Sequence, residues 1–301
     1  MAITTIEAGL TPHSPAPLKF VWLELTGLCN ESCDHCYADS GPQGTHGTMT
    51  LDTWRSVIDQ LATMGTESVS VIGGEPTLHP HIGELITHAH ERGLGVEVFS
   101  NMTYITDSLW TVLKATGASL ATSYYSDQAD EHDTITRHRG SHRKTRANVA
   151  KAVDLGIPIR GGVVTALPGQ RAHEAMADLA SLGVVEVGGD RMRAFGRASQ
   201  GAAPQVKDLC GHCAHEKCAV LPSGDVVPCV LGRFMPVGNV LDQPLAEIWS
   251  GPRLAAALAE IERECDTAQS CTPPQFLPTC GPCQPCVPTI GHCDPPGAAI
   301  A

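Results

Sequence analysis

The stretch Cys29-Asn-Glu-Ser-Cys33-Asp-His-Cys36 places three cysteines within eight residues, the first two separated by three residues and the last two by two. It follows an apolar run, Phe20 to Thr26, which predicts a β-strand leading into a cysteine-bearing loop. Thiolates favour iron–sulfur clusters, zinc and Cu(I). A cubane cluster normally takes a cysteine on every iron, so three cysteines leave one iron open to a bound molecule.

This spacing resembles the C-x3-C-x-aromatic-C signature of the radical S-adenosylmethionine (radical SAM) enzymes, with His35 at the aromatic position. The resemblance implies that Cys29, Cys33 and Cys36 hold a [4Fe–4S] cluster, with the amino and carboxylate groups of S-adenosylmethionine as the fourth ligand. It also implies that His35 lies against the adenine of that cofactor. A zinc knuckle or a chance grouping of cysteines is the alternative, because short motifs also match unrelated chains.

The composition of the 301-residue chain argues against two classes of partner. A formal net charge of −12 does not give the basic surface that nucleic-acid binding needs. The apolar runs are shorter than a membrane span, and residues 1–17 lack the basic and apolar regions of a secretory signal. Thirteen cysteines without such a signal indicate metal ligands rather than disulfides, and therefore a cytoplasmic protein.

Strand and helix patterns alternate from the first strand to a sixth one near residue 187, and a glycine closes most of the helices. This alternation predicts an α/β fold in which helices cover a parallel sheet. The period alone does not distinguish a flat sheet from a curved one, but the resemblance implies a partial (β/α)6, TIM-like barrel. The predicted strands after the first are 68–72, 95–99, 119–123, 157–164 and 184–187, and the predicted helices are 50–61, 81–92, 107–116, 145–155 and 172–182.

The chain divides, on the same basis, into three parts. Residues 1–17 are proline-rich and are expected to form a flexible arm, residues 18–200 are expected to form the radical SAM core, and residues 201–301 a small cysteine-rich, SPASM-like domain. In barrels of this kind the site lies at the C-terminal ends of the strands.

Two elements at predicted strand ends resemble cofactor-binding elements of the family. Gly73-Gly74-Glu75-Pro76 follows the second strand, and its glycines allow the backbone to approach a ligand closely. The resemblance implies that this turn binds the methionine amino group of the cofactor, whereas an ordinary tight turn is the alternative. Ser123 ends the fourth strand and corresponds to the serine of a Ser-x-Asp pattern that contacts the cofactor in the family.

A basic segment follows the fourth strand. Arg137 comes after His132-Asp133, an arrangement that resembles a His-Asp…Arg element whose guanidinium pairs with the cofactor carboxylate. Arginine suits this role because its planar fork binds carboxylates through two hydrogen bonds. Arg139 competes for the same role, and a solvated basic start to the next helix is the alternative for both. Asn101, after the third strand, is a further candidate near the substrate.

The remaining ten cysteines all follow residue 209. Gly224-x4-Cys229 and the later Gly238-Asn…Ile248-Trp249 resemble the SPASM extension of radical SAM enzymes, which carries auxiliary [4Fe–4S] clusters. The resemblance implies a first cluster on Cys218 and Cys229 with Cys210 or Cys213, and a distant cysteine is a candidate for its remaining ligand. A second cluster would draw on Cys265, Cys271, Cys280, Cys283, Cys286 and Cys293.

The second set departs from the usual C-x2-C-x5-C-x3-C run of SPASM domains, because Cys280-x2-Cys283-x2-Cys286-x6-Cys293 stands in its place. One or two auxiliary clusters are therefore expected. Structural zinc is the alternative, since sets of four cysteines also suit that metal.

The resemblance implies an enzyme in which reduction of the cluster, by flavodoxin or ferredoxin, cleaves S-adenosylmethionine. The resulting 5′-deoxyadenosyl radical abstracts a hydrogen atom from the substrate. Most SPASM enzymes modify peptides, so we expect a maturase of a ribosomally made peptide that forms a crosslink, thioether or epimer, with peptide recognition by a separate protein or by the peptide's leader. Modification of a small metabolite such as a sugar or amino acid, and a non-catalytic iron–sulfur electron carrier, are the alternatives.

Overall fold

The computed structural model describes residues 16–265, and a nine-stranded sheet runs through them. The strand order is β6-β5-β4-β3-β2-β1-β7-β8-β9, with parallel pairing from β6 to β7 and antiparallel pairing beyond. The strands are β1 (Phe20–Glu24), β2 (Ser68–Ile72), β3 (Gly95–Phe99), β4 (Ser119–Tyr124), β5 (Ile159–Thr165), β6 (Glu186–Arg191), β7 (Lys217–Val220), β8 (Asp225–Val227) and β9 (Gly238–Asn239).

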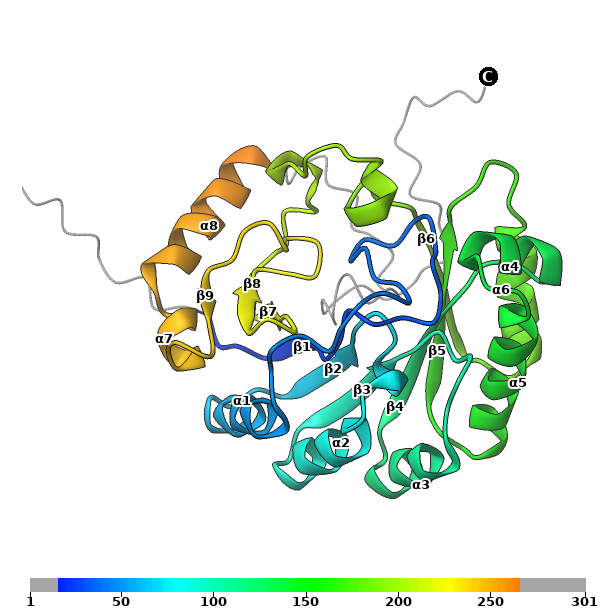
Figure 1. The fold of residues 1–301 in the computed structure, drawn as a ribbon, viewed down its shortest axis with the longest axis horizontal. Coiled ribbons are helices and arrows are strands. Elements are labelled where there is room, and N and C mark those ends of the chain that lie inside the picture. Colours follow the sequence, from blue (N-terminus) through cyan, green and yellow to red (C-terminus); the bar gives the residue numbers. More distant parts are fainter. Residues whose placement is uncertain (1–15, 266–301) are drawn as a thin grey trace, which may run out of the picture.

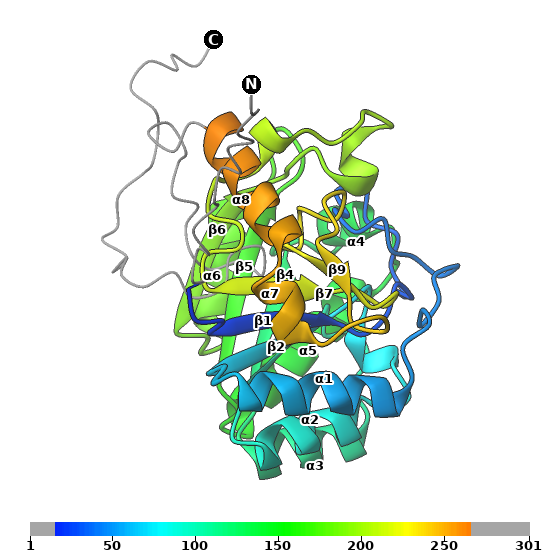
Figure 2. The same ribbon diagram turned by 90° about the vertical axis from the view of Figure 1, so that its left-hand side faces the viewer.

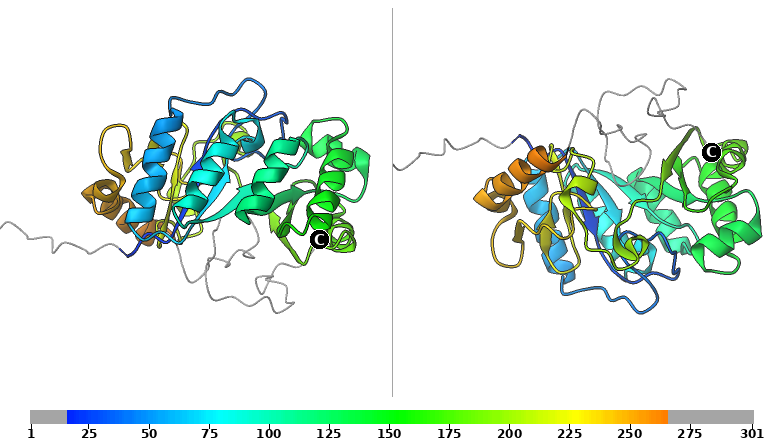
Figure 3. Two further views of the ribbon diagram at one scale, coloured as in Figure 1. Left: turned by 90° about the horizontal axis from the view of Figure 1, so that it is seen from below. Right: turned by 90° about the horizontal axis from the view of Figure 1, so that it is seen from above.

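Helices cover the outer face of this curved sheet, which forms a partial barrel as expected (Figure 1). Figure 2 shows α1, α2 and α3 side by side beneath β1 and β2, and both views in Figure 3 place α4, α5 and α6 together at the other end of the sheet. The helices are α1 (Leu51–Thr63), α2 (Ile82–Glu91), α3 (Asp107–Thr116), α4 (Ala129–Thr136), α5 (Ser141–Asp154), α6 (Ala172–Ser181), α7 (Leu245–Trp249) and α8 (Pro252–Glu264).

Alternation of side chains along β1 separates two hydrophobic cores. Val21 and Leu23 face the core beneath the helices, whereas Phe20 and Trp22 belong to a second core on the inner face. The helices bury their apolar stripe against the first core, as in α1, where Thr50 accepts a hydrogen bond from the Thr53 amide and caps the helix. The inner core extends from the strand ends to the cysteine-bearing C-terminal segment.

The C-terminal segment continues the sheet of the barrel. β7 pairs in parallel with β1, with Val21 opposite Cys218, and β7 and β8 then form an antiparallel hairpin around the Ser223-Gly224 turn. The barrel strands and the cysteine-bearing C-terminal segment therefore belong to one hydrogen-bonded sheet. No helix in the described part of the chain is long and apolar enough to cross a membrane.

Three differences from the sequence prediction concern residues near the site. β6 extends from Glu186 to Arg191 rather than over 184–187, because Gly188-Gly189 hides the strand pattern while the backbone still pairs with β5. Helix α4 was not predicted, because its polar sequence has little apolar periodicity, and α5 begins four residues earlier than expected, at Ser141. The extension of β6 therefore follows from its pairing with β5, which periodicity does not report.

Candidate active site

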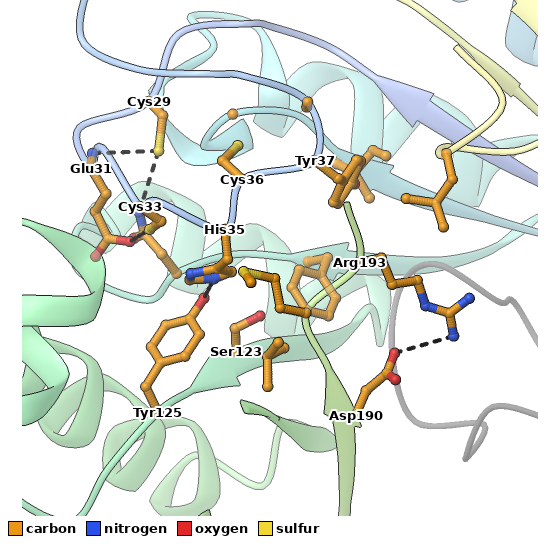
Figure 4. Close-up of a pocket in the computed structure, with 18 of the residues that line it drawn as sticks. Cys29, Glu31, Cys33, His35, Cys36, Tyr37, Ser123, Tyr125, Asp190 and Arg193 are labelled. Carbon is orange, nitrogen blue, oxygen red and sulfur yellow. Dashed lines mark hydrogen bonds and ion pairs between the residues drawn. The ribbon is translucent and has the colours of Figure 1, made fainter. Parts of the chain in front are cut away.

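The three N-terminal cysteines lie on the loop that leaves the C-terminal end of β1 and contribute to one pocket (Figure 4). Cys29 is buried, and Cys33 and Cys36 are half-buried. The pocket wall comes from the ends of β1 to β6, as expected for a barrel. Its remaining lining residues include His35, Tyr37, Gly73, Gly74, Asn101, Ser123, Tyr125, Asp190, Arg193 and Leu231.

Gly73 and Gly74 line the pocket where the loop after β2 crosses the loop after β1. A Cβ atom on Gly74 would lie 2.4 Å from the carbonyl oxygen of Leu28, and one on Gly73 would lie 2.8 Å from that of Thr26. The Gly74 amide donates to Thr26 and the Glu75 amide to Leu28, at 2.6 and 2.8 Å. The paired glycines thus allow two backbones to meet directly behind Cys29.

Glu75, expected to bind the cofactor, is buried behind the pocket rather than lining it. Its carboxylate accepts hydrogen bonds from the Thr77 hydroxyl and amide, from the Ser100 hydroxyl at 2.8 Å and from the Asn101 amide at 2.7 Å. Burial raises the pKa of Glu75, and these hydrogen bonds oppose the shift. The residue therefore joins the loops after β2 and β3, and its placement makes it a positioning residue.

His35 points into the pocket and contacts Tyr125 (Figure 4). The His35 Nε2 atom lies 3.0 Å from the Tyr125 hydroxyl, which also interacts with the Ser123 side chain. Burial lowers the pKa of His35 to about 4, so the ring is neutral near pH 7. Its buried Nδ1 atom has no hydrogen-bond partner among the described residues and remains available to a ligand.

Several lining residues escaped the sequence prediction. Tyr125 stands where the Ser-x-Asp pattern has its aspartate. This departure from the pattern is a sequence signal that could have identified Tyr125 as a candidate site residue. Glu31, between the first two cysteines, is buried, and burial raises its pKa to about 8; its Oε2 atom accepts from the Cys33 thiol at 3.4 Å. At the opposite wall Asp190 and Arg193 form an ion pair at 3.6 Å (Figure 4). No sequence signal distinguishes this pair from solvated charges.

Arg137 lies away from the pocket, and this placement revises the prediction that it pairs with the cofactor carboxylate. It ends α4 in a left-handed conformation, and its exposed guanidinium forms an ion pair with Asp34 at 2.7 Å. The two neighbouring loops, rather than the cofactor pocket, therefore determine where this side chain points. Arg193, which does line the pocket, was not predicted.

Four cysteines of the C-terminal segment gather on the inner side of the sheet. The sulfur atoms of Cys213 and Cys229 lie 3.0 Å apart, and Cys210 also interacts with the Cys213 thiol. Cys265, at the end of α8, belongs to the same inner core and interacts electrostatically with Cys210 and Cys229. Thiols from three separate parts of the chain thus come together in one place.

Cys218 lies apart from this group, which corrects the prediction that it binds the first auxiliary cluster. It sits on β7 opposite Val21, so its side chain faces the helix-covered core rather than the inner one. Burial raises its pKa to about 12, with no other cause. Cys265, expected in a second cluster, joins the first group instead. Cys271, Cys280, Cys283, Cys286 and Cys293 lie outside the described residues.

Comparison with known proteins identifies the family. Residues 23–182, more than half of the chain, match the model of the Radical SAM superfamily. The chain belongs to the radical SAM superfamily. Residues 210–286 of this radical SAM enzyme match the SPASM model, an iron–sulfur cluster-binding domain.

Similar proteins fall into two groups by coverage. The mycofactocin maturase MftC of Mycobacterium tuberculosis is 28% identical over 93% of this chain and 78% of its own length. The AdoMet-dependent heme synthase of Methanosarcina barkeri is 31% identical, but the match spans 44% of this chain and only 38% of that protein. The subtilosin biosynthesis protein AlbA of Bacillus subtilis is 27% identical, with 52% and 35% covered.

Two solved structures of proteins with bound S-adenosylmethionine share the fold. SuiB of Streptococcus suis bound to S-adenosylmethionine superimposes with a TM-score of 0.68 at 15% identity, covering 86% of this chain and 73% of SuiB. The structure of anSMEcpe with bound AdoMet gives a TM-score of 0.66 at 12% identity, covering 86% and 89%.

The residues of the pocket suit the cluster and cofactor of the superfamily. Three thiols on one loop supply soft ligands for iron, and the Gly73-Gly74 turn leaves its backbone close to them. The unpartnered Nδ1 atom of His35 offers a hydrogen bond to a ligand. This donor set favours a [4Fe–4S] cluster with S-adenosylmethionine over a closed zinc site, which takes four protein ligands.

Proposed function

We propose that this radical SAM enzyme is a maturase that modifies a ribosomally made peptide. The similarity to MftC supports this function, because it extends over both the radical SAM core and the SPASM segment. PqqA peptide cyclase of Xanthomonas euvesicatoria, 25% identical over 79% of this chain, gives a second comparison with a peptide-modifying enzyme. The substrate peptide would meet the chain at the mouth of the pocket between the β6 end and the cysteine loop.

In this proposal Cys29, Cys33 and Cys36 hold the cluster, and Gly73 and Gly74 present backbone groups to S-adenosylmethionine. When bound, the cluster and S-adenosylmethionine together would supply abstraction of a hydrogen atom from an unactivated C–H bond of the substrate. His35, fixed by Tyr125 and Ser123, orients the adenosine through its free Nδ1 atom. The buried wall around them excludes water from the reacting atoms.

We further propose one auxiliary [4Fe–4S] cluster on Cys210, Cys213, Cys229 and Cys265. The place of Cys213, Cys229 and Cys265 in the inner core and the interactions of Cys210 with Cys213 and Cys265 support this assignment, and so does the position of Leu231, two residues after Cys229, in the wall of the pocket. The cysteines outside the described residues would hold any second cluster. An external one-electron donor such as flavodoxin or ferredoxin, and a separate peptide-recognition protein, complete the system.

The test uses the full chain, reconstituted with iron and sulfide under anaerobic conditions, with S-adenosylmethionine, dithionite and short peptides encoded beside the gene. We expect 5′-deoxyadenosine and a change of peptide mass, both lost in the Cys29→Ala/Cys33→Ala/Cys36→Ala variant. Deoxyadenosine without any modified peptide, but with a modified sugar or amino acid, would contradict the peptide assignment. If the protein carries its iron–sulfur cluster and still forms no 5′-deoxyadenosine, the proposal that it is a radical SAM enzyme is contradicted.

A further inference from the structure

A buried ion pair joins the barrel to the C-terminal segment beside the site. Glu24 ends β1 and is 1% exposed, and its Oε2 atom accepts a hydrogen bond from the Arg233 guanidinium, which is 26% exposed. Arg233 follows Cys229 by four residues, so the segment that carries this cysteine also carries the cation. The second carboxylate oxygen of Glu24 is buried without a hydrogen-bond partner in the described part of the chain.

Tyr37 connects this ion pair to both groups of thiols. Tyr37, directly after Cys36, packs on the inner core that contains Cys213 and Cys229 and also lines the pocket. Burial raises the pKa of the Tyr37 phenol, and Glu24, Arg233, Cys36 and Cys229 all act on it electrostatically. The Arg233 side chain is therefore close to the end of the cysteine loop, at Cys36 and Tyr37.

Arg233 brings a cation into a largely buried place, where the Glu24 carboxylate pairs with it. Such a pair is weak evidence for stabilisation, because the desolvation of both ions offsets their attraction. Cys36 and Tyr37 each raise the pKa of Arg233, as Glu24 does, although burial opposes them. A guanidinium stays charged in proteins, so this site keeps a fixed positive charge within electrostatic range of Cys36.

We propose that Arg233, held by Glu24, raises the reduction potential of the cluster on Cys29, Cys33 and Cys36. The proposal rests on the proposed function of those cysteines. A reduced cluster carries one more negative charge than the oxidised cluster, so a nearby fixed cation in a low-dielectric region stabilises the reduced form. Through Arg233, the C-terminal segment would thereby help to determine the reduction potential of the cluster in the barrel. Arg233 is a positioning residue in this scheme, because it acts through the cluster and touches no reacting atom.

The test is a redox titration of the reconstituted full chain, followed by electron paramagnetic resonance. The signal that changes on addition of S-adenosylmethionine identifies the barrel cluster and separates it from auxiliary clusters. We expect Arg233→Gln to shift its midpoint potential to a more negative value and Arg233→Lys, which keeps the charge, to stay near the wild-type value. Arg55→Gln, which removes one charge from the exposed face of α1, is the matched control and should leave the potential unchanged.

The partner residue gives a second arm. Glu24→Gln breaks the same ion pair but removes a negative charge, so its midpoint potential should equal or exceed that of the wild type. A shift of Glu24→Gln in the same negative direction as Arg233→Gln would indicate structural damage and overturn the proposal. A potential of Arg233→Gln equal to or above the wild-type value would also overturn it. If the wild-type protein shows no signal that responds to S-adenosylmethionine, the proposed function is contradicted instead.

Discussion

The Nε2 atom of His35 lies 3.0 Å from the hydroxyl oxygen of Tyr125, so a residue of the cysteine motif is fixed by the strand end on the opposite side of the pocket. This contact sets the direction of the free Nδ1 atom. Replacing the phenol by phenylalanine removes one hydrogen bond, worth about 1 kcal/mol. We expect Tyr125→Phe to weaken binding of S-adenosylmethionine about fivefold, as measured by equilibrium dialysis of the reconstituted protein.

His35→Phe restores the family's aromatic residue and removes the same Nδ1 atom. Its affinity for S-adenosylmethionine should fall by a similar factor. The affinity of the double variant His35→Phe/Tyr125→Phe should be no lower than that of either single variant. Additive losses in the double variant would show that the two side chains act independently and would contradict the paired arrangement.

Gly74 tests the close contact between the first two loops. A methyl group there would lie 2.4 Å from the Leu28 carbonyl oxygen, so Gly74→Ala must displace the backbone next to Cys29. We expect loss of bound iron and of S-adenosylmethionine binding. Gly83→Ala, within α2, is the matched control, because its methyl group meets only Val112 at 3.6 Å. It should keep the iron and gain about 0.5–1 kcal/mol of stability. Equal iron in both variants would refute the argument.

The two faces of the sheet separate Cys218 from the auxiliary group. Cys213→Ser and Cys265→Ser should each lose iron equivalent to about one cluster, because each removes a thiol from the group of four. Cys218→Ala should keep its full iron content and lose about 1 kcal/mol of folding stability from the helix-covered core. Iron analysis after anaerobic reconstitution measures all three. A loss in Cys218→Ala as large as that in Cys213→Ser would show that Cys218 is a ligand.

His132 gives a pH dependence whose sign is determined by burial. The ring is 1% exposed, its Nδ1 atom lies 3.0 Å from the Ser141 hydroxyl oxygen, and burial lowers its pKa to about 3. In the unfolded chain the His132 ring is protonated as the pH falls below about 6.5, whereas in the folded chain it stays neutral at that pH. The free energy of unfolding therefore has its full value above pH 6.5 and decreases as the pH falls toward 3.

Urea unfolding of the apoprotein at several pH values between 6 and 4 measures this effect. His132→Asn removes the titrating ring, so its stability should decline less steeply than that of the wild type, by about 1.4 kcal/mol per pH unit. Parallel pH profiles for the two proteins would show that His132 is protonated equally in the folded and unfolded states.

Local patterns predicted the helix-covered parallel sheet and the first cysteine loop, whereas the curvature of the barrel was implied only by the family resemblance. The period of α1, its Thr50 cap and the spacing of Cys29, Cys33 and Cys36 are all contained in short segments. The pairing of β7 with β1 is not local, and it decides which face each cysteine of the C-terminal segment occupies. Cys218 therefore could not be separated from Cys213 by spacing alone.

Side chains that act through contacts across the pocket were also beyond the sequence. Glu75 has the expected position in its turn, but only the structure shows that its carboxylate accepts hydrogen bonds from the Ser100 hydroxyl and the Asn101 amide. Arg137 has the residue type that a carboxylate needs, yet the left-handed end of α4 directs it toward Asp34. Tyr125 and Arg193 come from strand ends whose side-chain directions depend on the curvature of the sheet.

The most direct test of the three-cysteine site is electron–nuclear double resonance on the reduced, reconstituted chain with S-adenosylmethionine labelled by 15N at its amino group. The account predicts a 15N coupling to the cluster that disappears in the Cys29→Ala/Cys33→Ala/Cys36→Ala variant. A cluster whose spectrum ignores the labelled cofactor, or zinc in place of iron on these three thiols, would contradict it.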